Sequence, residues 1–229
     1  VLIVSYVFPP FPGIGGRRWS KFAKELAKRG SKVFVLAAKN PFTEISPWMK
    51  DVEKNPLIII KYLPLNYPRY LLAVPQNFFE KIMYRISLFF LKITSPGNYY
   101  DRAVNWRKQL QRETENLVKK FSINNIIVTG SPFHLMHHLI ETKSRFPELN
   151  LVADFRDPWT NNPNFFGFAA LSEKRQRRER QMEKEVLENA DCIISVAEEM
   201  NAYLKTISAP LQKFIALENG FDADDFPGK

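Results

Sequence analysis

Apolar and polar positions divide the chain into short apolar runs separated by segments of helical periodicity. The runs are continuous rather than alternating, which is typical of strands buried on both faces of a parallel sheet. They predict strands at residues 1–7, 31–38, 57–63, 125–130, 150–155, 191–196 and 214–217. Apolar positions three and four apart predict helices at residues 19–28, 77–93, 102–121, 132–145, 170–190 and 197–206. This alternation predicts an α/β protein, with a doubly wound, mostly parallel sheet of Rossmann type over residues 1–217.

The first strand is followed by a glycine-rich loop, with Gly13, Gly15 and Gly16, and then by a helix that Gly30 closes. The N-terminus of a helix presents unpaired N–H groups and a partial positive charge, which favour an anion such as phosphate. We therefore expect Gly15, Gly16 and Arg18 to lie at a ligand-binding cleft. The alternative is that the glycines only form a tight first turn. Arg18 occupies the place of the third glycine in the dinucleotide fingerprint, and no acid ends the second strand, so NAD is not expected.

Polar residues also follow the fourth and fifth predicted strands, at the edge of the sheet where open α/β proteins bind ligands. Ser131 is expected to cap the next helix, and His134 lies in the first turn of that helix. Asp154, Arg156 and Asp157 stand at the end of the fifth strand, where charges are costly unless they are paired or functional. One interpretation is an internal Arg–Asp bridge that pins the loop, and the other is a polar wall of an active-site cleft.

All three histidines lie on the helix predicted at residues 132–145. His134 and His138 are four residues apart and could share a metal ion. No third ligand stands nearby, and the helix lacks the glutamate of a metalloprotease motif. We therefore expect no metal site, and of the three histidines we place only His134 at the ligand-binding edge.

Residues 64–100 form an aromatic and basic segment punctuated by prolines, which we interpret as an insertion. Within it, residues 77–93 predict a strongly apolar helix that is too short and too charged to span a bilayer. One hypothesis places this helix in a membrane interface, with these residues facing anionic lipid: Phe78, Phe79, Phe89, Phe90 and Arg85. The alternative is that the helix packs on the sheet or on a partner domain.

Charge is distributed unevenly along the chain, which has a formal net charge of +9. Residues 1–60 carry 10 Lys and Arg against 4 Asp and Glu, residues 61–120 carry 11 against 4, and residues 121–229 carry 12 against 16. The basic first half indicates an anionic partner such as phospholipid, nucleic acid or a phosphorylated ligand. The basic cluster at residues 170–190 is balanced by acids at i,i+4 spacing, which is typical of an exposed helix, so nucleic acid is not expected.

Cys192, the one cysteine, lies in a predicted buried strand. A chain with one cysteine forms no internal disulfide, which fits a reducing compartment. No run of residues is long and apolar enough to form a spanning helix. We expect a cytoplasmic protein that associates peripherally with the inner face of the cell membrane.

Three parts of the chain, taken in order, resemble the N-terminal domain of GT-B-fold glycosyltransferases of the large retaining "group 1" family. The loop and helix of FPPFPGIGGRRWSKFAKELAKRGSKVFVLA are similar to the opening of that domain. LVADFRDPW and ADCIISVAEEMNAYL resemble its fifth and sixth strands with the segments that follow them. KFIALENGFDADDF resembles the NG(V/F)D linker between the two domains, which places Asn219 at the cleft and residues 218–229 at the start of the linker. The resemblance covers nearly the whole chain and is weakest over residues 64–100.

In that family the N-terminal domain binds the acceptor, and a C-terminal domain of similar size, expected beyond this chain, holds the nucleotide-sugar donor. The resemblance thus implies retaining transfer of a hexose to a glycan or lipid-linked acceptor, in cell-envelope polysaccharide biosynthesis, without a metal or another cofactor. This chain alone is expected to be inactive. Arg156-Asp157 replaces the His-Asp of many members, so no catalytic histidine carries over. We expect Arg156 to contact donor phosphate or a charged acceptor and Asp157 to bind sugar hydroxyls. The alternative is a non-catalytic peripheral membrane or partner-binding module.

Overall fold

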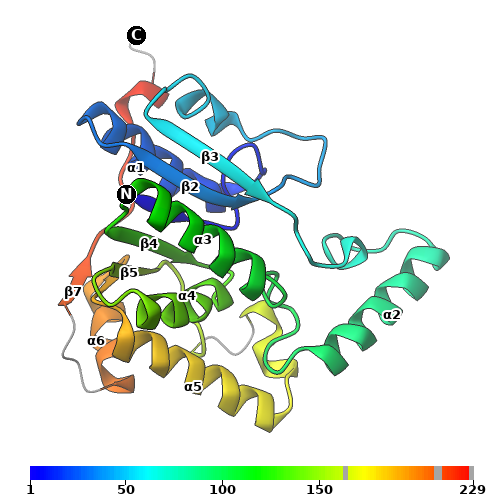
Figure 1. The fold of residues 1–229 in the computed structure, drawn as a ribbon. Coiled ribbons are helices and arrows are strands. Elements are labelled where there is room, and N and C mark those ends of the chain that lie inside the picture. The colour runs from blue at the N-terminus through cyan, green and yellow to red at the C-terminus, as the bar shows by residue number, and fades with distance from the viewer. Residues whose placement is uncertain (162–164, 209–212, 227–229) are drawn as a thin grey trace.

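A computed structural model describes residues 1–161, 165–208 and 213–226, coloured along the chain in Figure 1. In these residues seven parallel strands form one sheet, in the order β3-β2-β1-β4-β5-β6-β7. The strands are β1 (Leu2–Val4), β2 (Val33–Ala38), β3 (Ile58–Leu63), β4 (Asn125–Gly130), β5 (Asn150–Phe155), β6 (Cys192–Ser195) and β7 (Lys213–Ala216). The α-helices are α1 (Arg17–Lys28), α2 (Phe78–Thr94), α3 (Arg107–Phe121), α4 (His134–Arg145), α5 (Glu173–Asn189) and α6 (Glu198–Ile207). The predicted α/β class with a doubly wound parallel sheet is confirmed.

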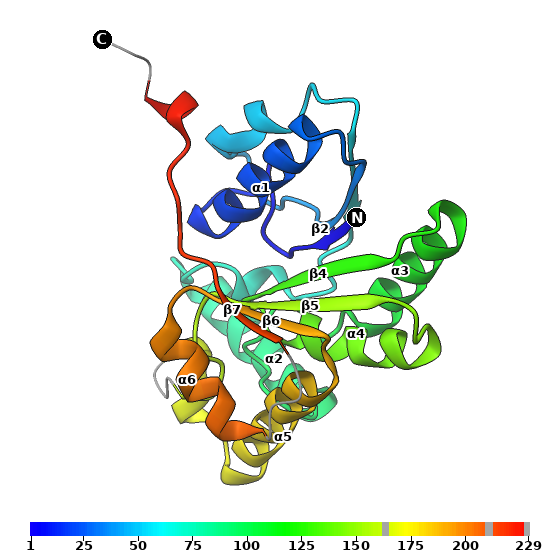
Figure 2. The same ribbon diagram turned by 90° about the vertical axis from the view of Figure 1, so that its left-hand side faces the viewer.

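Helices cover both faces of this sheet, and the alternation of side chains along a strand shows which helix lies on which face. Ile3 of β1 joins Trp19 and Ala23 of α1 in one buried cluster. Leu2 and Val4, which point the opposite way, are buried with residues of α3, α4, α5 and α6. Figure 2 shows the strands between α1 and the helices α4 to α6. Right-handed crossovers require this arrangement, because the chain moves in opposite directions from β1 to β3 and from β4 to β7.

The strand order reverses beside β1, which pairs with β2 on one side and with β4 on the other. Leu2 stands opposite both Phe34 and Ile126, so the two neighbouring strands are in step across β1. The segments that leave β1 and β4 go to opposite faces of the sheet, which opens a crevice at the carboxyl ends of these strands. The loops after β1, β4 and β5 therefore meet where open α/β sheets bind ligands.

Helices α3 and α4 both begin later than predicted, and the buried carboxylate of Asp101 lies before both of them. Asp101 Oδ1 accepts a hydrogen bond of 2.9 Å from Ala103 N, in a turn that precedes α3. Asp101 Oδ2 accepts from the backbone N atoms of Phe133, at 2.7 Å, and His134, at 3.2 Å. Asp101 therefore caps α4, and the prediction that Ser131 caps this helix is wrong.

The predicted insertion leaves the sheet and carries α2 away from the body of the protein (Figure 1). Leu91, at the C-terminal end of α2, is buried in a small cluster with Tyr99. The Arg175 guanidinium, from α5, donates to the carbonyl oxygens of Ser95 and Gly97 at 2.6 Å each and fixes this end of the helix. No helix in the described part of the chain is long and apolar enough to cross a membrane.

Candidate functional site

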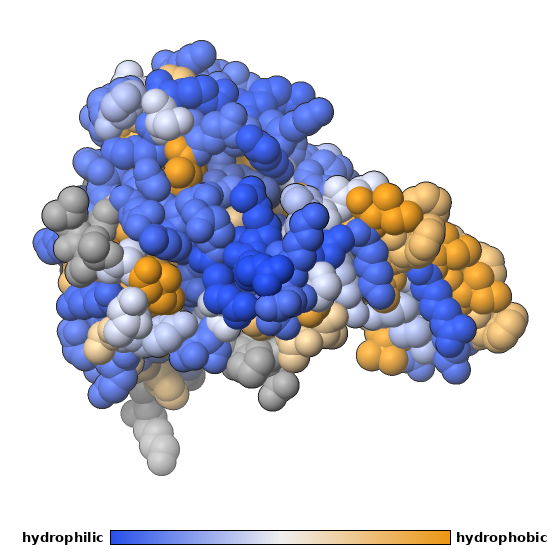
Figure 3. Space-filling view, turned by 90° about the horizontal axis from the view of Figure 1, so that it is seen from below, coloured by the Kyte–Doolittle hydropathy of each residue, from blue (hydrophilic) through white to orange (hydrophobic). Residues whose placement is uncertain are grey.

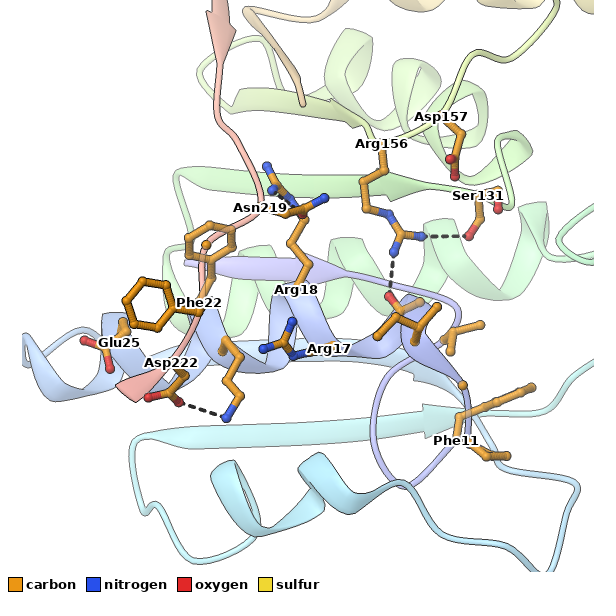
Figure 4. A pocket seen from close by; sticks show the side chains of 18 of the residues that line it. Phe11, Arg17, Arg18, Phe22, Glu25, Ser131, Arg156, Asp157, Asn219 and Asp222 are labelled. Atoms are coloured by element: carbon orange, nitrogen blue, oxygen red, sulfur yellow. Dashed lines mark hydrogen bonds and ion pairs between the residues drawn. The ribbon is translucent and has the colours of Figure 1, made fainter. Parts of the chain in front are cut away.

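A cavity of about 970 Å³ lies at the carboxyl edge of the sheet. Its walls come from the glycine loop after β1, the first turns of α1, the loops after β4 and β5, and residues 219–224, which follow β7 (Figure 4). Six residues that the sequence places at a cleft line it: Gly15, Arg18, Ser131, Arg156, Asp157 and Asn219. Three further candidates are buried and lie outside its lining: Gly16, His134 and Asp154.

Asp154 is fully buried at the end of β5, where it joins three elements beneath the cavity. Its carboxylate accepts hydrogen bonds from Trp19 Nε1 at 2.6 Å and from Thr129 Oγ1 at 2.9 Å. Arg18 Nη2 lies 3.4 Å from the other carboxylate oxygen, so the pair forms a buried salt bridge. The carboxylate therefore fixes the start of α1 against β4 and β5, and its role is to hold the cavity in shape.

Arg18 also fastens the segment that follows β7. Residues 217–226, which we call the strap, run back past α1 (Figure 2). Arg18 donates to the Leu217 carbonyl oxygen at 2.8 Å and to Asn219 Oδ1 at 2.9 Å. The strap contains the start of the predicted linker, of which residues 227–229 lie outside the described residues. Because Arg18 already has these partners, its function in the structure is to pin the rim of the cavity.

Lysines of α1 hold the outer part of the strap. Lys21 Nζ and Lys24 Nζ lie 2.8 and 2.7 Å from Asp222 Oδ2. Hydrogen bonds from these lysines hold the pKa of Asp222 well below its usual range. Arg17 Nη2 lies 3.5 Å from Asp225. Much of the positive charge of α1 is thus neutralised by the strap itself.

Arg156 connects three loops around the cavity. Its Nη1 donates to the Gly15 carbonyl oxygen at 2.6 Å and its Nη2 to that of Ser131 at 3.4 Å (Figure 4). Its Nε donates to the Gly130 carbonyl oxygen at 2.8 Å. Burial lowers the pKa of Arg156, but an arginine stays charged in proteins. The internal Arg–Asp bridge, one of the two interpretations of this segment, is not formed among the described residues: Asp154 pairs with Arg18 of α1, and Arg156 holds carbonyl groups.

Three polar groups of the lining remain available to a ligand. Within the described part of the chain, the side chains of Asp157, Ser131 and Arg102 make no hydrogen bond or ion pair with protein. Burial raises the pKa of the Asp157 carboxyl, although the charge of Arg156 acts in the opposite direction. The sequence does not single out Arg102, because its surroundings predict a helix over residues 102–121. Its position directly after the buried Asp101 is visible only in the fold.

His134 lies away from the cavity, in contrast to its predicted position at the ligand-binding edge. It is 3% exposed, and its Nε2 lies 2.9 Å from Glu179 Oε1 of α5. The same carboxylate accepts from Trp159 Nε1 at 2.9 Å. His138 Nε2 meets a different partner, the Ala103 carbonyl oxygen, at 3.0 Å. Among the described residues no group of three or more His, Cys, Asp or Glu side chains could hold a metal ion.

The two adjacent glycines of the loop differ in the space around them. A Cβ atom on Gly16 would lie 3.3 Å from Phe8 Cα, Pro9 Cδ and the Val7 carbonyl oxygen, which is tighter than ordinary contact. A Cβ atom on Gly15 would meet its nearest neighbour, Val7 Cβ, at 3.6 Å. Gly16 is therefore required for close packing of α1 on the loop, whereas Gly15 faces the cavity and has room.

We expect Gly16→Ala to lower the free energy of unfolding by about 1–3 kcal/mol, because a rigid backbone must move to admit the methyl group. Gly15→Ala serves as the matched control and should change it by less than about 0.5 kcal/mol. Chemical denaturation of both variants measures the difference. Equal stabilities of the two variants would contradict the proposed close packing at Gly16.

Comparison with known proteins gives likeness in structure alone. No family model matches the chain, and no curated protein matches it. The sucrose-phosphate synthase of Thermosynechococcus elongatus is 15% identical, with a TM-score of 0.55, over 97% of this chain and 48% of that one. LpCGTa in complex with UDP is 13% identical, with a TM-score of 0.48, over 96% and 54%. Spinosyn rhamnosyltransferase SpnG, complexed with spinosyn aglycone, is 12% identical, with a TM-score of 0.41, over 85% and 44%.

The likeness to the sucrose-phosphate synthase agrees with the fold class that the sheet defines. A doubly wound parallel sheet carries an open cavity at its topological switch point. The chain has the fold of one Rossmann-like half of the GT-B glycosyltransferase architecture, as its resemblance to that family implied. It spans about half the length of the solved structures that it matches, with 48% of the sucrose-phosphate synthase covered.

Proposed function

We propose that the protein transfers a sugar from a nucleotide-sugar donor to a glycan or lipid-linked acceptor. In this proposal the chain forms the acceptor side of the cleft, and a C-terminal half of similar size, joined through the strap, holds the donor. The observation that carries the proposal is the open cavity at the switch point of a chain that matches half of a sucrose-phosphate synthase. Catalysis by this half alone is not expected, because half of the cleft would be missing.

The acceptor would be held by the polar groups of the lining that have no partner among the described residues. A carboxylate such as Asp157 accepts hydrogen bonds from sugar hydroxyls, and its raised pKa makes it a better proton acceptor than an exposed aspartate. Ser131 lies beside it as a second hydrogen-bonding group. Arg102, also in the lining, would balance negative charge on an acceptor or on the donor phosphate.

The donor diphosphate would approach the glycine loop and the start of α1. Arg156 holds the Gly15 carbonyl oxygen, so the loop is in place before any ligand binds. The N-terminus of α1, where Gly16 is the cap residue, would add a partial positive charge opposite the leaving phosphate. We propose retention of configuration, and no metal or other cofactor, on the sequence resemblance. The same resemblance supports a cytoplasmic role in cell-envelope polysaccharide biosynthesis.

To test the proposal, the full-length protein is incubated with UDP-, GDP- and dTDP-sugars, and release of the nucleoside diphosphate is measured. Asp157→Asn should lower kcat/KM by about 10- to 100-fold, since a hydrogen bond to a charged group contributes about 1.5–3 kcal/mol. Glu173→Gln makes the same chemical change at an exposed position on α5 and should leave kcat/KM unaltered. No release from any nucleotide sugar would refute the proposal, and turnover by residues 1–229 alone would refute the two-half cleft.

The exposed apolar face of α2 favours a second candidate function, a peripheral membrane or partner-binding module without chemistry of its own. This candidate predicts that the full-length protein releases no nucleoside diphosphate while its surface binding is intact. The turnover assay therefore separates the two functions.

A further inference from the structure

The apolar face of α2 points away from the protein. Its large side chains are between 40% and 79% exposed: Phe78, Phe79, Ile82, Ile86, Phe89, Phe90 and Ile93. In the space-filling view, apolar colour gathers over the part that projects from the body (Figure 3). Soluble proteins rarely leave so large a contiguous apolar surface in water unless it binds something.

Apolar, basic and packing side chains occupy separate sides of α2. At about 100° per residue, the seven apolar positions cover one unbroken arc of about 120°. Three exposed cations, Lys81, Arg85 and Lys92, form a strip directly beside this arc. Leu91, on another side, is the residue of α2 that is buried against the protein. The helix therefore has an apolar face, a basic edge and a separate packing face.

We propose that α2 docks on an anionic phospholipid bilayer, with its apolar arc inserted among the acyl chains and its basic edge at the headgroups. A helix with bulky apolar side chains on one face and Lys and Arg beside them binds in the interface plane in this way. Cations near the surface of an anionic membrane are attracted to it. Residues 66–100 contain four Lys and Arg and one acid, Glu80.

The charge favours lipid over a protein partner. The buried centre of a protein interface is depleted of charged residues, and its lysines are few. Here Lys81 and Arg85 stand on the same exposed side of the helix as Phe78 and Phe89. Glu80 does not pair with these cations, because its carboxylate accepts a hydrogen bond of 2.7 Å from the Gln76 backbone N and caps the helix.

α2 is fixed to α5 at its C-terminal end, where Arg175 donates to the carbonyl groups that follow the helix. Its N-terminal half contacts the turn at Arg69–Leu71, with the ring centroids of Tyr70 and Phe79 6.3 Å apart. The segment that returns from α2 ends at Arg102, which lines the cavity. Docking of α2 would thus bring the acceptor cavity toward the bilayer, a consequence that rests on the proposed transferase function. The docking itself does not rest on it, because vesicle binding needs no turnover.

The test is co-sedimentation of the full-length protein with vesicles of phosphatidylcholine, alone or mixed with phosphatidylglycerol. We expect binding to the anionic vesicles and at least about 30-fold weaker binding to the neutral ones, because the attraction of every cation is lost there. Phe89→Glu/Phe90→Glu should weaken anionic binding by at least about 100-fold, because two rings that would insert among the acyl chains are lost. Lys81→Gln/Arg85→Gln should weaken it by about 30-fold, since each cation contributes on the order of 1 kcal/mol.

A second pair of exposed phenylalanines gives the matched control. Phe221 and Phe226 of the strap lie with ring centroids 6.2 Å apart, and those of Phe89 and Phe90 lie 6.1 Å apart. Phe221→Glu/Phe226→Glu makes the same change in charge and should keep anionic binding. No binding by the unaltered protein, or equal loss with both pairs, overturns the proposal. Self-association that Phe89→Glu/Phe90→Glu abolishes, without vesicle binding, would assign the face to a protein partner and also overturn it.

Discussion

Replacing Asp154 with alanine should lower the free energy of unfolding by about 3–5 kcal/mol, the range found when one partner of a buried ion pair is removed. The carboxylate is fully buried and paired with Arg18, which is 8% exposed and whose guanidinium would keep its charge after losing its one carboxylate partner among the described residues. The change also leaves Trp19 Nε1 without its acceptor, and Thr129 Oγ1 keeps only its contact of 3.2 Å with the Gly130 carbonyl oxygen. Since these groups come from α1 and β4, the loss would loosen the contact between both walls of the cavity.

Equilibrium denaturation of Asp154→Ala measures this loss, and Asp157→Ala is its control. Asp157 is three residues later and only partly buried, and the described residues offer its carboxylate no hydrogen-bond partner. Its replacement should therefore change the free energy of unfolding by less than about 1 kcal/mol. If both variants unfold at the same denaturant concentration as the unaltered protein, the ion pair does not hold α1 to the sheet. Arg18→Met should restore part of the stability of Asp154→Ala, because it removes the uncompensated charge.

The sheet could be predicted because its strands are short, continuous and apolar. All residues of β2, Val33–Ala38, are buried, and so the sequence contrast with the polar residues on either side is sharp. The ends of β4 and β5 agree with the prediction to the residue. Order along the chain and the handedness of crossovers then leave few topologies to choose from.

Apart from Asn219, which the resemblance to the interdomain linker placed at the cleft, the site could be predicted where a residue lies within two positions of a strand end or in or next to the glycine loop. Ser131 and Asp157 satisfy this condition and line the cavity. The partners of Arg18 on the strap are about 200 residues away in sequence, so no local sequence pattern predicts them. The same holds for Asp101, which caps α4 across 32 residues. Polar contacts between distant segments decide these roles, and only the fold brings them together.

The predicted position of His134 at the ligand-binding edge is wrong for the same reason: a contact with a residue distant in sequence decides where its side chain lies. The first turn after β4 does face the carboxyl edge, but the imidazole turns toward α5 and meets Glu179. Glu179 lies in a charge-rich helix whose composition predicts an exposed surface, yet it is 1% exposed. A balanced pattern of charges along a helix does not predict which acidic side chain is buried, because burial depends on the neighbouring helix that packs against that side chain.

The buried His134 should make the protein lose stability as the pH rises from about 6.5 to 9. Burial alone would lower the pKa of this histidine, but the charges of Asp101 and Glu179 and the hydrogen bond to Glu179 raise it to about 9. Arg178 of α5 and His138 of α4 face the same region, and Arg178 acts in the opposite direction. Attraction to His134 correspondingly lowers the pKa of Glu179, although burial opposes this shift.

The sign of the effect follows from where each state loses its proton. Below pH 6.5 both the folded and the unfolded protein hold the proton on His134, so the stabilisation by Asp101 and Glu179 is fully present. As the pH rises toward 9 the unfolded chain releases its proton while the folded protein keeps it, and about 3 kcal/mol of unfolding free energy should be lost. Denaturation at several pH values measures the slope. His134→Gln should remove it, and His137→Gln, at a partly exposed position beside Glu185, should retain it. A slope unchanged by His134→Gln would show that the proton lies elsewhere.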